Sequence, residues 1–365
     1  MKKLSNSNGN FEYELLDQKQ PVVDLRDQLA GLYSSPFADI LWWELRDLSL
    51  INNGYYKLFY YEQSVLKHII LFKYSAELPG KIIVLTHTFK ISSENIENIS
   101  CILFYEFDKL QQIIFENIFE PKPKKLPKMV FERGLNDIVI FLPDTLDTYM
   151  KSLGMSTRKK IRLIQNRIAK DFPDFKVHYN ENGDILFKQI ERLISLNKDR
   201  MIVTGKKSFL TDTDCKLLYQ YASTSGFGLL CLCTIDDKII GGTINYVIGE
   251  HAYMHVISHD NSYNKYSIGQ IALFNATKYL IEEKNIKYYH LMSGSQDYKF
   301  RHGGIYHDRY IFWVFRNNGV HYFWRKTMSS FKENGRKYKA RLRTNKIINS
   351  FFIKLEKIKM KIQGV

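Results

Sequence analysis

Residues 266–270, with the sequence Tyr-Ser-Ile-Gly-Gln, lie between a predicted strand, residues 251–259, and a predicted helix, residues 268–284. Small residues at such a junction allow backbone N–H groups to point outward, and the positive end of a helix dipole attracts an anion. The pattern is typical of a pyrophosphate site, although a glycine near the start of a helix is more often only a turn residue. The candidate binding residues at this junction are Ser267, Ile268, Gly269 and Gln270.

Two arginines, Arg158 and Arg162, are one turn apart on a helix predicted near residues 156–168. Such a pair can hold a phosphate or a carboxylate of an acceptor, whereas most charges on a helix face are simply solvated. Asn197, Arg200 and Lys207 flank the end of another predicted helix and are further candidates for an acceptor pocket.

Three histidines, His251, His255 and His259, are spaced like metal ligands on a helix, but the surrounding residues predict a strand. Strand residues four apart lie about 13 Å from each other, so these three side chains cannot share one ion. The four cysteines lack a paired metal-binding spacing, and we expect them to be buried thiols. The sequence therefore predicts no metal site.

The second half of the chain predicts two helices, at 185–201 and 213–223, and then three strands, at 228–235, 239–248 and 251–259. The short connections between these strands predict an antiparallel meander. A helix, a strand at 287–292, a loop and a last strand at 309–316 follow.

The first half predicts a short helix at 36–47, strands at 55–61, 64–74, 81–90 and 101–107, and a helix at 110–119. Residues 121–128, PKPKKLPK, predict an exposed connector. The fold class is therefore α+β, in two units.

The net charge of +15 is unevenly distributed. Residues 1–150 carry −4, residues 151–320 carry +8, and residues 321–365 carry +11 from 13 basic and 2 acidic side chains. Apolar residues recur at helical spacing over 348–358 with lysines among them, which predicts a basic amphipathic helix. This tail could dock on the protein's own core, which is the default, lie on an anionic membrane or hold RNA.

Three stretches together resemble the GNAT superfamily of CoA-dependent N-acyltransferases, in the branch of CelD-like and Fem-type proteins. They are residues 263–270 with a "Y-S-x-G" helix start, the strand at 287–291, and residues 293–299 with a "G-x-x-x-Y-K" loop. Arg158-Lys159-x-x-Arg162 is similar to the basic element of the same branch. The resemblance covers residues 140–315, and His290 departs from it, because the family commonly has an acidic residue there.

The resemblance implies tandem GNAT-like units, each a mostly antiparallel mixed sheet flanked by helices. We expect a disordered N-terminus at 1–10, a degenerate GNAT-like unit at 11–136, an acyltransferase unit at 137–320 and a basic helical tail at 321–365.

It also implies that a thioester donor, acetyl-CoA, binds between splayed central strands, with no metal. Its phosphates are expected at Ser267–Gln270, with Ile257 and Ser258 beside them. Tyr298 and Lys299 are expected to supply an oxyanion donor and an acid for the departing thiolate. Candidates for the base are Glu250, His259 and Asp260. The residues expected to contact the acceptor are Arg158, Arg162, Arg200 and Asp297.

The function that follows is transfer of an acetyl group from acetyl-CoA to an amine of a sugar or a cell-envelope polysaccharide precursor, which could be lipid-linked. One alternative is a Fem-type peptidyltransferase that uses aminoacyl-tRNA, and nucleic acid is otherwise not expected as a partner. Another is a catalytically inactive GNAT fold that serves as a binding module. We expect a cytoplasmic protein, and the tail leaves a peripheral place on the inner face of the membrane open.

Overall fold

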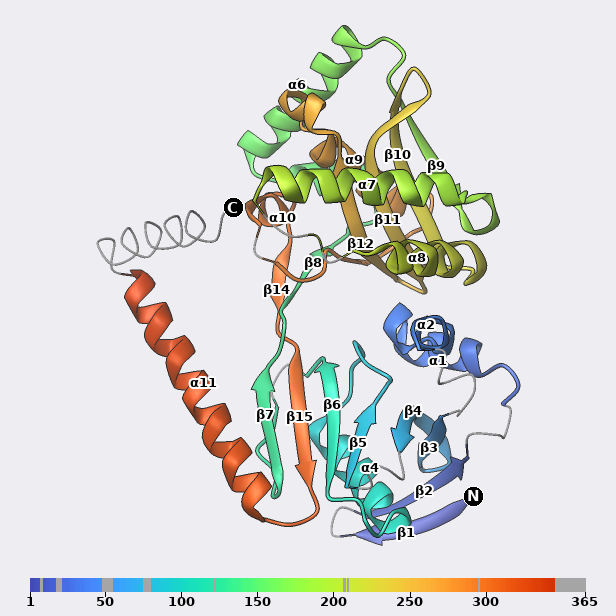
Figure 1. Cartoon of the computed structure of the whole chain (residues 1–365), viewed down its shortest axis with the longest axis vertical. Helices are drawn as coiled ribbons and strands as arrows, with labels where there is room; N and C mark the ends of the chain where they lie inside the picture. Colours follow the sequence, from blue (N-terminus) through green and yellow to red (C-terminus); the bar gives the residue numbers. More distant parts are fainter. Residues whose placement is uncertain are drawn as a thin grey trace.

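The computed structural model describes residues 1–6, 9–17, 22–47, 55–74, 80–120, 123–205, 208, 210–294 and 296–344. Two β-sheets lie one above the other along the long axis of the molecule (Figure 1). The elements of the first unit are β1 (Lys2–Asn6), β2 (Gly9–Leu16), α1 (Leu25–Tyr33), η1 (Pro36–Ala38), α2 (Ile40–Arg46), β3 (Tyr56–Glu62), β4 (Val65–Tyr74), β5 (Lys81–Val84), α4 (Ser93–Glu106), β6 (Gln112–Ile118) and β7 (Met129–Arg133).

The second unit follows directly. Its elements are β8 (Asp137–Phe141), α5 (Leu146–Ser152), α6 (Met155–Asp171), β9 (Lys176–Glu181), η2 (Asn182–Asp184), α7 (Phe187–Val203), α8 (Asp212–Thr224), β10 (Gly228–Ile235), β11 (Lys238–Ile248), β12 (His251–His259), η3 (Asn261–Tyr266), α9 (Ile268–Glu282), β13 (Tyr288–His290), α10 (Asp297–Arg301) and β14 (Ile305–His307). The chain ends its described part with β15 (Tyr310–Phe315) and α11 (Val320–Thr344).

The first sheet has the strand order β1-β2-β3-β4-β5-β6-β15-β7, and the second has the order β14-β8-β13-β12-β11-β10-β9. Each sheet contains one parallel ladder, β5–β6 and β12–β13 respectively, and the other ladders between the described strands are antiparallel. The expected α+β class, with two mostly antiparallel sheets flanked by helices, is confirmed.

Strand β15 corrects the predicted boundary at residue 320. It pairs with β6 on one side and β7 on the other, so it belongs to the first sheet although it follows the second unit in sequence. Phe312, Trp313, Val314 and Phe315 are all buried. A strand that is apolar on both faces must lie inside a sheet, and the first sheet provides that place.

Residues 101–119 correct two predicted elements. The predicted strand at 101–107 lies in helix α4, which buries Ile96, Ile99, Ile102 and Leu103, and the predicted helix at 110–119 contains strand β6. Short continuous apolar runs satisfy both periodicities, so spacing alone does not separate them. Ser92 caps α4 by accepting from the backbone N–H of Asn95 at 3.1 Å, which fixes the helix start.

The prediction of a disordered N-terminus over residues 1–10 is wrong for residues 2–6, which form β1, antiparallel to β2. Lys2 binds Glu106 of α4 with 2.7 Å between Nζ and Oε1. Leu4 packs against the first core. This side-chain anchoring explains why a polar edge segment is ordered.

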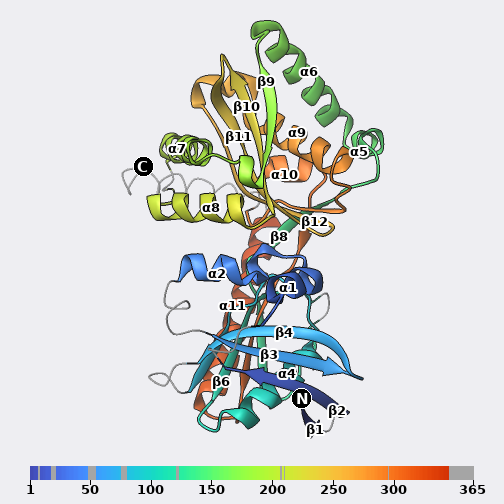
Figure 2. The same cartoon turned by 90° about the vertical axis from the view of Figure 1, so that its right-hand side faces the viewer.

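The two units share a core. Phe37 and Trp42 of the first unit pack in the second unit's hydrophobic cluster, where Trp42 meets Tyr221 edge to face with ring centroids 5.0 Å apart. The Tyr221 hydroxyl donates to Asp39 at 3.0 Å. Figure 2 shows α1 and α2 between the two sheets. These contacts fix the units relative to each other.

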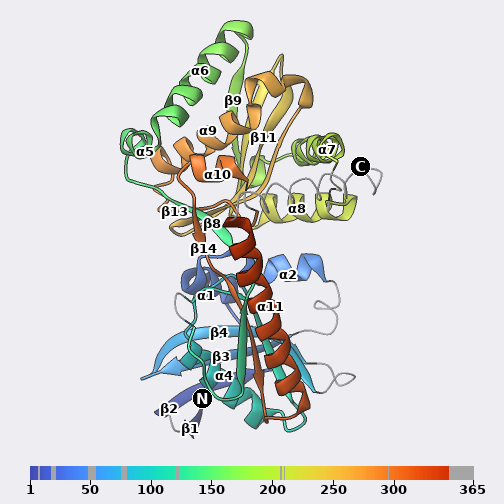
Figure 3. The ribbon, with the colours of Figure 1, turned by 90° about the vertical axis from the view of Figure 1, so that its left-hand side faces the viewer.

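Helix α11 runs along the first unit (Figure 3). Arg325 binds Glu132 of β7 at 3.0 Å and its guanidinium lies 3.4 Å from the ring centroid of Trp313. The amphipathic helix predicted at 348–358 lies outside the described residues. No helix in the described part of the chain is long and apolar enough to span a membrane.

Candidate functional site

The junction of β12 and α9 is built around a left-handed residue. Ser267 has φ of 52°, which turns the chain sharply from η3 into α9. Its side chain makes no capping hydrogen bond to the start of the helix. The first N–H groups of α9 therefore receive no side-chain acceptor from Ser267.

A cavity of about 200 Å³ opens at this helix start. Its lining residues are Arg200, Ile257, His259, Asn264, Ser267, Gly269, Gln270 and Tyr298. The structure thus brings together six of the residues named from the sequence as donor, catalytic or acceptor contacts, together with the base candidate His259. We call this space the α9 cavity.

Arg200 gives the α9 cavity a positive charge. Its guanidinium forms no hydrogen bond or ion pair with any described residue, and its Nε is buried without a partner. Burial lowers its pKa, yet an arginine keeps its charge at neutral pH. An uncompensated cation beside the positive end of a helix is a site for an anion.

Tyr298 of α10 supplies a proton donor on the same cavity. Burial raises the pKa of its hydroxyl to about 12. The phenol therefore stays protonated at neutral pH, and it can donate to a developing oxyanion or protonate a leaving thiolate.

His259 lies against the helix start. Its Nε2 is 2.9 Å from Oδ1 of Asn264, and its Nδ1 is buried without a partner. Burial lowers its pKa, so the ring is neutral near pH 7. With Nε2 donating to Asn264, Nδ1 carries a lone pair toward Gly269.

Lys299 lies outside the α9 cavity and is 3% exposed. Its ammonium donates to the carbonyl oxygens of Leu291, Met292 and Ser293, at 2.7, 3.1 and 2.8 Å. Burial lowers its pKa to about 8. All three N–H donors are in use, so this geometry fits a residue that positions the chain after β13 rather than an oxyanion donor.

The chain held by Lys299 creates a gap between β12 and β13. The two strands pair only at His251–Tyr253 and Tyr288–His290. Beyond that point β12 continues to His259, whereas Leu291 stays beside β8 and donates its N–H to the carbonyl of Ile138 at 2.7 Å. The central strands are therefore splayed, with Tyr253 and His290 as the last pair.

Other predicted site residues have structural partners elsewhere. Asp260 binds Arg192 at 3.3 Å and accepts from the amide of Ser262 at 2.9 Å, so it caps η3. Asp297 pairs with Arg301 one turn later in α10. Neither carboxylate lines the α9 cavity.

The arginines of α6 are also apart from the cavity. Arg158 donates to the carbonyl of Lys151 at 2.9 Å, and Arg162 is exposed. Ser258 and Ile268 are fully buried, Ile268 in a hydrophobic cluster. Glu250 lies in the turn before β12, at the opposite end of that strand from Ser267.

A second, larger cavity of about 780 Å³ lies between the two units. The first unit contributes Thr88, Phe89, Lys90, Phe119 and Glu120, and the second contributes Glu250, His251, Tyr253, Tyr288, His290 and Tyr306 among others. We call it the inter-unit cavity. No local sequence pattern predicts this cavity, because its residues come from segments far apart in the chain. Of its lining residues, the sequence singles out the base candidate Glu250, the histidine spacing at His251, and His290.

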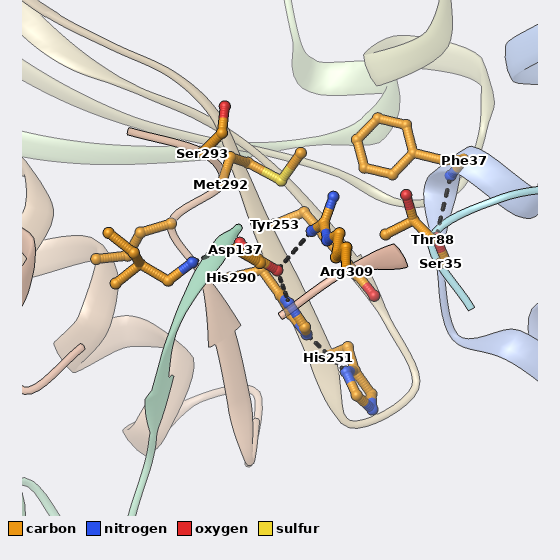
Figure 4. A network of polar contacts seen from close by, with 12 residues as sticks. Ser35, Phe37, Thr88, Asp137, His251, Tyr253, His290, Met292, Ser293 and Arg309 are labelled. Atoms are coloured by element: carbon orange, nitrogen blue, oxygen red, sulfur yellow. Dashed lines mark hydrogen bonds and ion pairs between the residues drawn. The ribbon is translucent and has the colours of Figure 1, made fainter. Parts of the chain in front are cut away.

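A buried polar cluster forms one wall of this cavity (Figure 4). Oδ2 of Asp137 is 2.6 Å from Nδ1 of His290 and 2.5 Å from the guanidinium of Arg309. Burial alone would raise the pKa of Asp137, but Arg309 and His290 hold it below its usual value. Nε2 of His290 is 2.9 Å from Nδ1 of His251.

Comparison with known proteins decides the family of this region. Residues 155–300 match the family model described as an acetyltransferase (GNAT) domain. This segment is a GNAT domain. The GNAT domain contains both the α9 cavity and the splayed strands, which confirms the resemblance seen in the sequence. No curated protein matches the chain significantly.

Solved structures share the fold over both units. FemX superposes with a TM-score of 0.61 at 12% identity, covering 81% of this chain and 97% of that chain. L-PGS from Bacillus licheniformis gives 0.50 at 11% identity, over 87% and 98%. A conserved protein of unknown function from Bacteroides thetaiotaomicron gives 0.50 at 11% identity, over 82% and 99%. The shared fold therefore extends beyond the GNAT domain, over 81% to 87% of this chain.

No three His, Cys, Asp or Glu side chains in the described part of the chain are grouped so that they could hold a metal ion.

Proposed function

We propose that the protein is an N-acyltransferase in which acetyl-CoA binds in the α9 cavity and an amine binds in the inter-unit cavity. The observation that carries the donor site is the unpaired guanidinium of Arg200 beside the start of α9. A pyrophosphate would supply the missing counter-charge. The gap between β12 and β13 begins beside this cavity and ends at Tyr253 and His290, which line the inter-unit cavity. An acyl chain can therefore enter from one cavity and meet an acceptor from the other.

The walls of the inter-unit cavity support an amine on a ring-shaped acceptor, such as an amino sugar of an envelope precursor. Phe141 and Tyr306, on adjacent strands β8 and β14, are 49% and 52% exposed and line the cavity with Tyr288. Flat aromatic surfaces suit the apolar face of a ring. Glu250 and Asp308 also line it, and their carboxylates favour a cationic amine.

Calorimetry with acetyl-CoA tests the donor site. We expect Arg200→Met to weaken acetyl-CoA binding by at least about tenfold, because a charge-assisted contact is lost. Lys216→Met removes one positive charge from the exposed face of α8 and should leave the affinity within about twofold. Equal affinities for wild type and Arg200→Met would place the phosphates elsewhere.

The second candidate function is transfer from aminoacyl-tRNA. The excess of basic residues over 151–320 favours it, and the terminal phosphates of a tRNA would also suit Arg200. If wild type binds alanyl-tRNA in a gel shift and does not bind acetyl-CoA, this alternative replaces the first. Binding of neither donor would favour an inactive binding module.

A further inference from the structure

His251, His290 and Asp137 form a continuous hydrogen-bonded chain from the inter-unit cavity into the core. Asp137 is fully buried and His290 nearly so, whereas His251 is half-buried and lines the cavity. No hydrogen bond joins Nε2 of His251 to another described residue, and Figure 4 shows this ring edge pointing away from His290.

The carboxylate of Asp137 sets the proton positions along this chain. Oδ2 of Asp137 can only accept, so Nδ1 of His290 carries a proton toward it. In the neutral state, Nε2 of His290 then has a lone pair, which accepts from Nδ1–H of His251. By elimination, Nε2 of His251 presents a lone pair to the cavity.

Ring stacking and a backbone hydrogen bond hold the side chains of His251, His290 and Asp137 in place. The ring of Tyr253 stacks on His290 with centroids 4.2 Å apart and planes 8° apart, and Tyr288 stacks on His251 at 4.5 Å. Oδ1 of Asp137 accepts from the backbone N–H of Ile138 at 2.9 Å. His251 and Tyr253 occupy one face of β12, and Tyr253 pairs with His290 where the strands begin to separate.

We propose that His251 is the catalytic base that takes a proton from the acceptor amine, and that His290 and Asp137 position it. This inference rests on the proposed function. His251 then accepts the proton on the amine side, in the inter-unit cavity. Tyr298 faces the leaving group on the other side, in the α9 cavity.

The acceptor nitrogen, in its neutral amine form after the ammonium has released one proton to solvent, bonds to the acyl carbonyl carbon while the C–S bond of the thioester breaks. One N–H proton passes to Nε2 of His251, whose Nδ1 proton moves to Nε2 of His290, giving an imidazolium beside the Asp137 carboxylate. The leaving thiolate takes a proton from Tyr298, and solvent returns the released proton to that phenol.

Nitrogen-15 NMR of the histidine rings tests the proton positions without any substrate. Near neutral pH we expect wild-type His251 to be protonated on Nδ1 and not on Nε2. His290→Gln should remove this preference, and Asp137→Asn should shift it in both rings if the variant folds. A wild-type His251 protonated on Nε2 would overturn the proposal, whether or not a donor binds.

Thiol release from acetyl-CoA with glucosamine as the probe amine tests the role in turnover. We expect His251→Gln to lower kcat by about 10²-fold or more while KM for acetyl-CoA stays unchanged, and imidazole to restore part of the activity of His251→Ala. His178→Gln, on the far strand β9, is the matched control and should behave like wild type. Unchanged kcat in His251→Gln would exclude the base role.

The two proposals fail in different ways. If wild type does not bind acetyl-CoA, the proposed donor is wrong, and the ring tautomers still decide the His251 proposal. If acetyl-CoA binds and turns over but His251→Gln is as active as wild type, the donor proposal stands and the base is elsewhere.

Helix α11 carries five large apolar side chains that are exposed and recur at helical spacing: Val320, Phe323, Trp324, Met328 and Phe331. The opposite face is docked, since Arg325 and Lys332 bind Glu132 and Ser329 donates to the carbonyl of Phe131. The apolar stripe therefore faces away from the protein.

We infer that this stripe, defined by those five side chains, lies on an anionic lipid surface. Residues 321–365 carry 13 basic and 2 acidic side chains in sequence, so the net charge of this part of the chain complements acidic headgroups. Tryptophan and phenylalanine suit the interface between headgroups and acyl chains.

Co-sedimentation of the full chain with vesicles tests this surface. We expect binding to vesicles of phosphatidylglycerol and phosphatidylcholine at low salt, weaker binding at about 500 mM NaCl, and little binding to phosphatidylcholine alone. Trp324→Ser with Phe331→Ser should reduce binding at least about tenfold, whereas Val23→Ser, at a similarly exposed position of the first unit, should not. Dimerisation through the stripe without vesicle binding would overturn the inference.

Discussion

Gly269 lies so close to His259 that a β-carbon at this position would be 3.2 Å from Nδ1 of the histidine. The residue at 269 thus decides how much room remains between the start of α9 and the end of β12. A larger side chain there must displace His259 or fill the α9 cavity.

Gly269→Glu should abolish most acetyl-CoA binding. The substitution adds bulk beside His259 and a negative charge where a phosphate is proposed to bind. Calorimetry should show a loss of about 10- to 10²-fold, since one contact to a charged group is worth about 1.5–3 kcal/mol. Gly183→Glu is the control, because a β-carbon at Gly183 meets nothing within 4 Å. Unchanged acetyl-CoA affinity in Gly269→Glu would show that the donor binds elsewhere.

Tyr298→Phe should lower turnover while leaving donor binding intact. The phenol keeps its proton at neutral pH because burial raises its pKa to about 12, and the variant loses only the hydroxyl. We expect kcat to fall on the order of 10²-fold and the Kd for acetyl-CoA to change less than about threefold. Tyr219→Phe on α8 provides the same chemical change away from the cavity. A kcat within a factor of a few of wild type would leave Tyr298 as a packing residue.

Lys299→Met should act through stability. The substitution leaves the carbonyl oxygens of Leu291, Met292 and Ser293 without their buried donor. We expect a loss of about 2–4 kcal/mol in the free energy of unfolding, measured with urea, together with weaker acetyl-CoA binding. Lys287→Met removes a lysine from an exposed ion pair with Asp144 and should cost less than about 1 kcal/mol. Wild-type stability with lost turnover would instead return Lys299 to a direct role in the reaction.

The sequence predicts the α9 cavity well because its residues lie on short segments with strong local patterns. A positive φ at the helix start and a neighbouring glycine are properties of the chain between β12 and α9. The inter-unit cavity depends on contacts between Phe89, Phe119 and His290, which no local pattern relates. The place of β15 in the first sheet is equally invisible to local patterns. It depends on pairing with β6 and β7, which are distant from β15 in sequence.

Acid should destabilise the fold through its buried histidines, and His302 offers a test of one of them. Burial lowers the pKa of His302 to about 4, and both ring nitrogens are buried without a partner. The unfolded chain therefore binds one more proton than the native state between about pH 4 and 6.5, so His302 lowers stability as pH falls through that window.

His302→Leu should remove this contribution. Urea unfolding at about pH 7 and pH 5.5 should show that the variant loses less stability than wild type, by up to about 1.4 kcal/mol per pH unit. His178→Gln changes an exposed histidine and should keep the wild-type slope. Equal slopes for His302→Leu and wild type would mean that His302 has the same proton affinity in the native and unfolded states, and the acid sensitivity would then have to come from other buried groups such as His68, whose pKa burial also lowers to about 4.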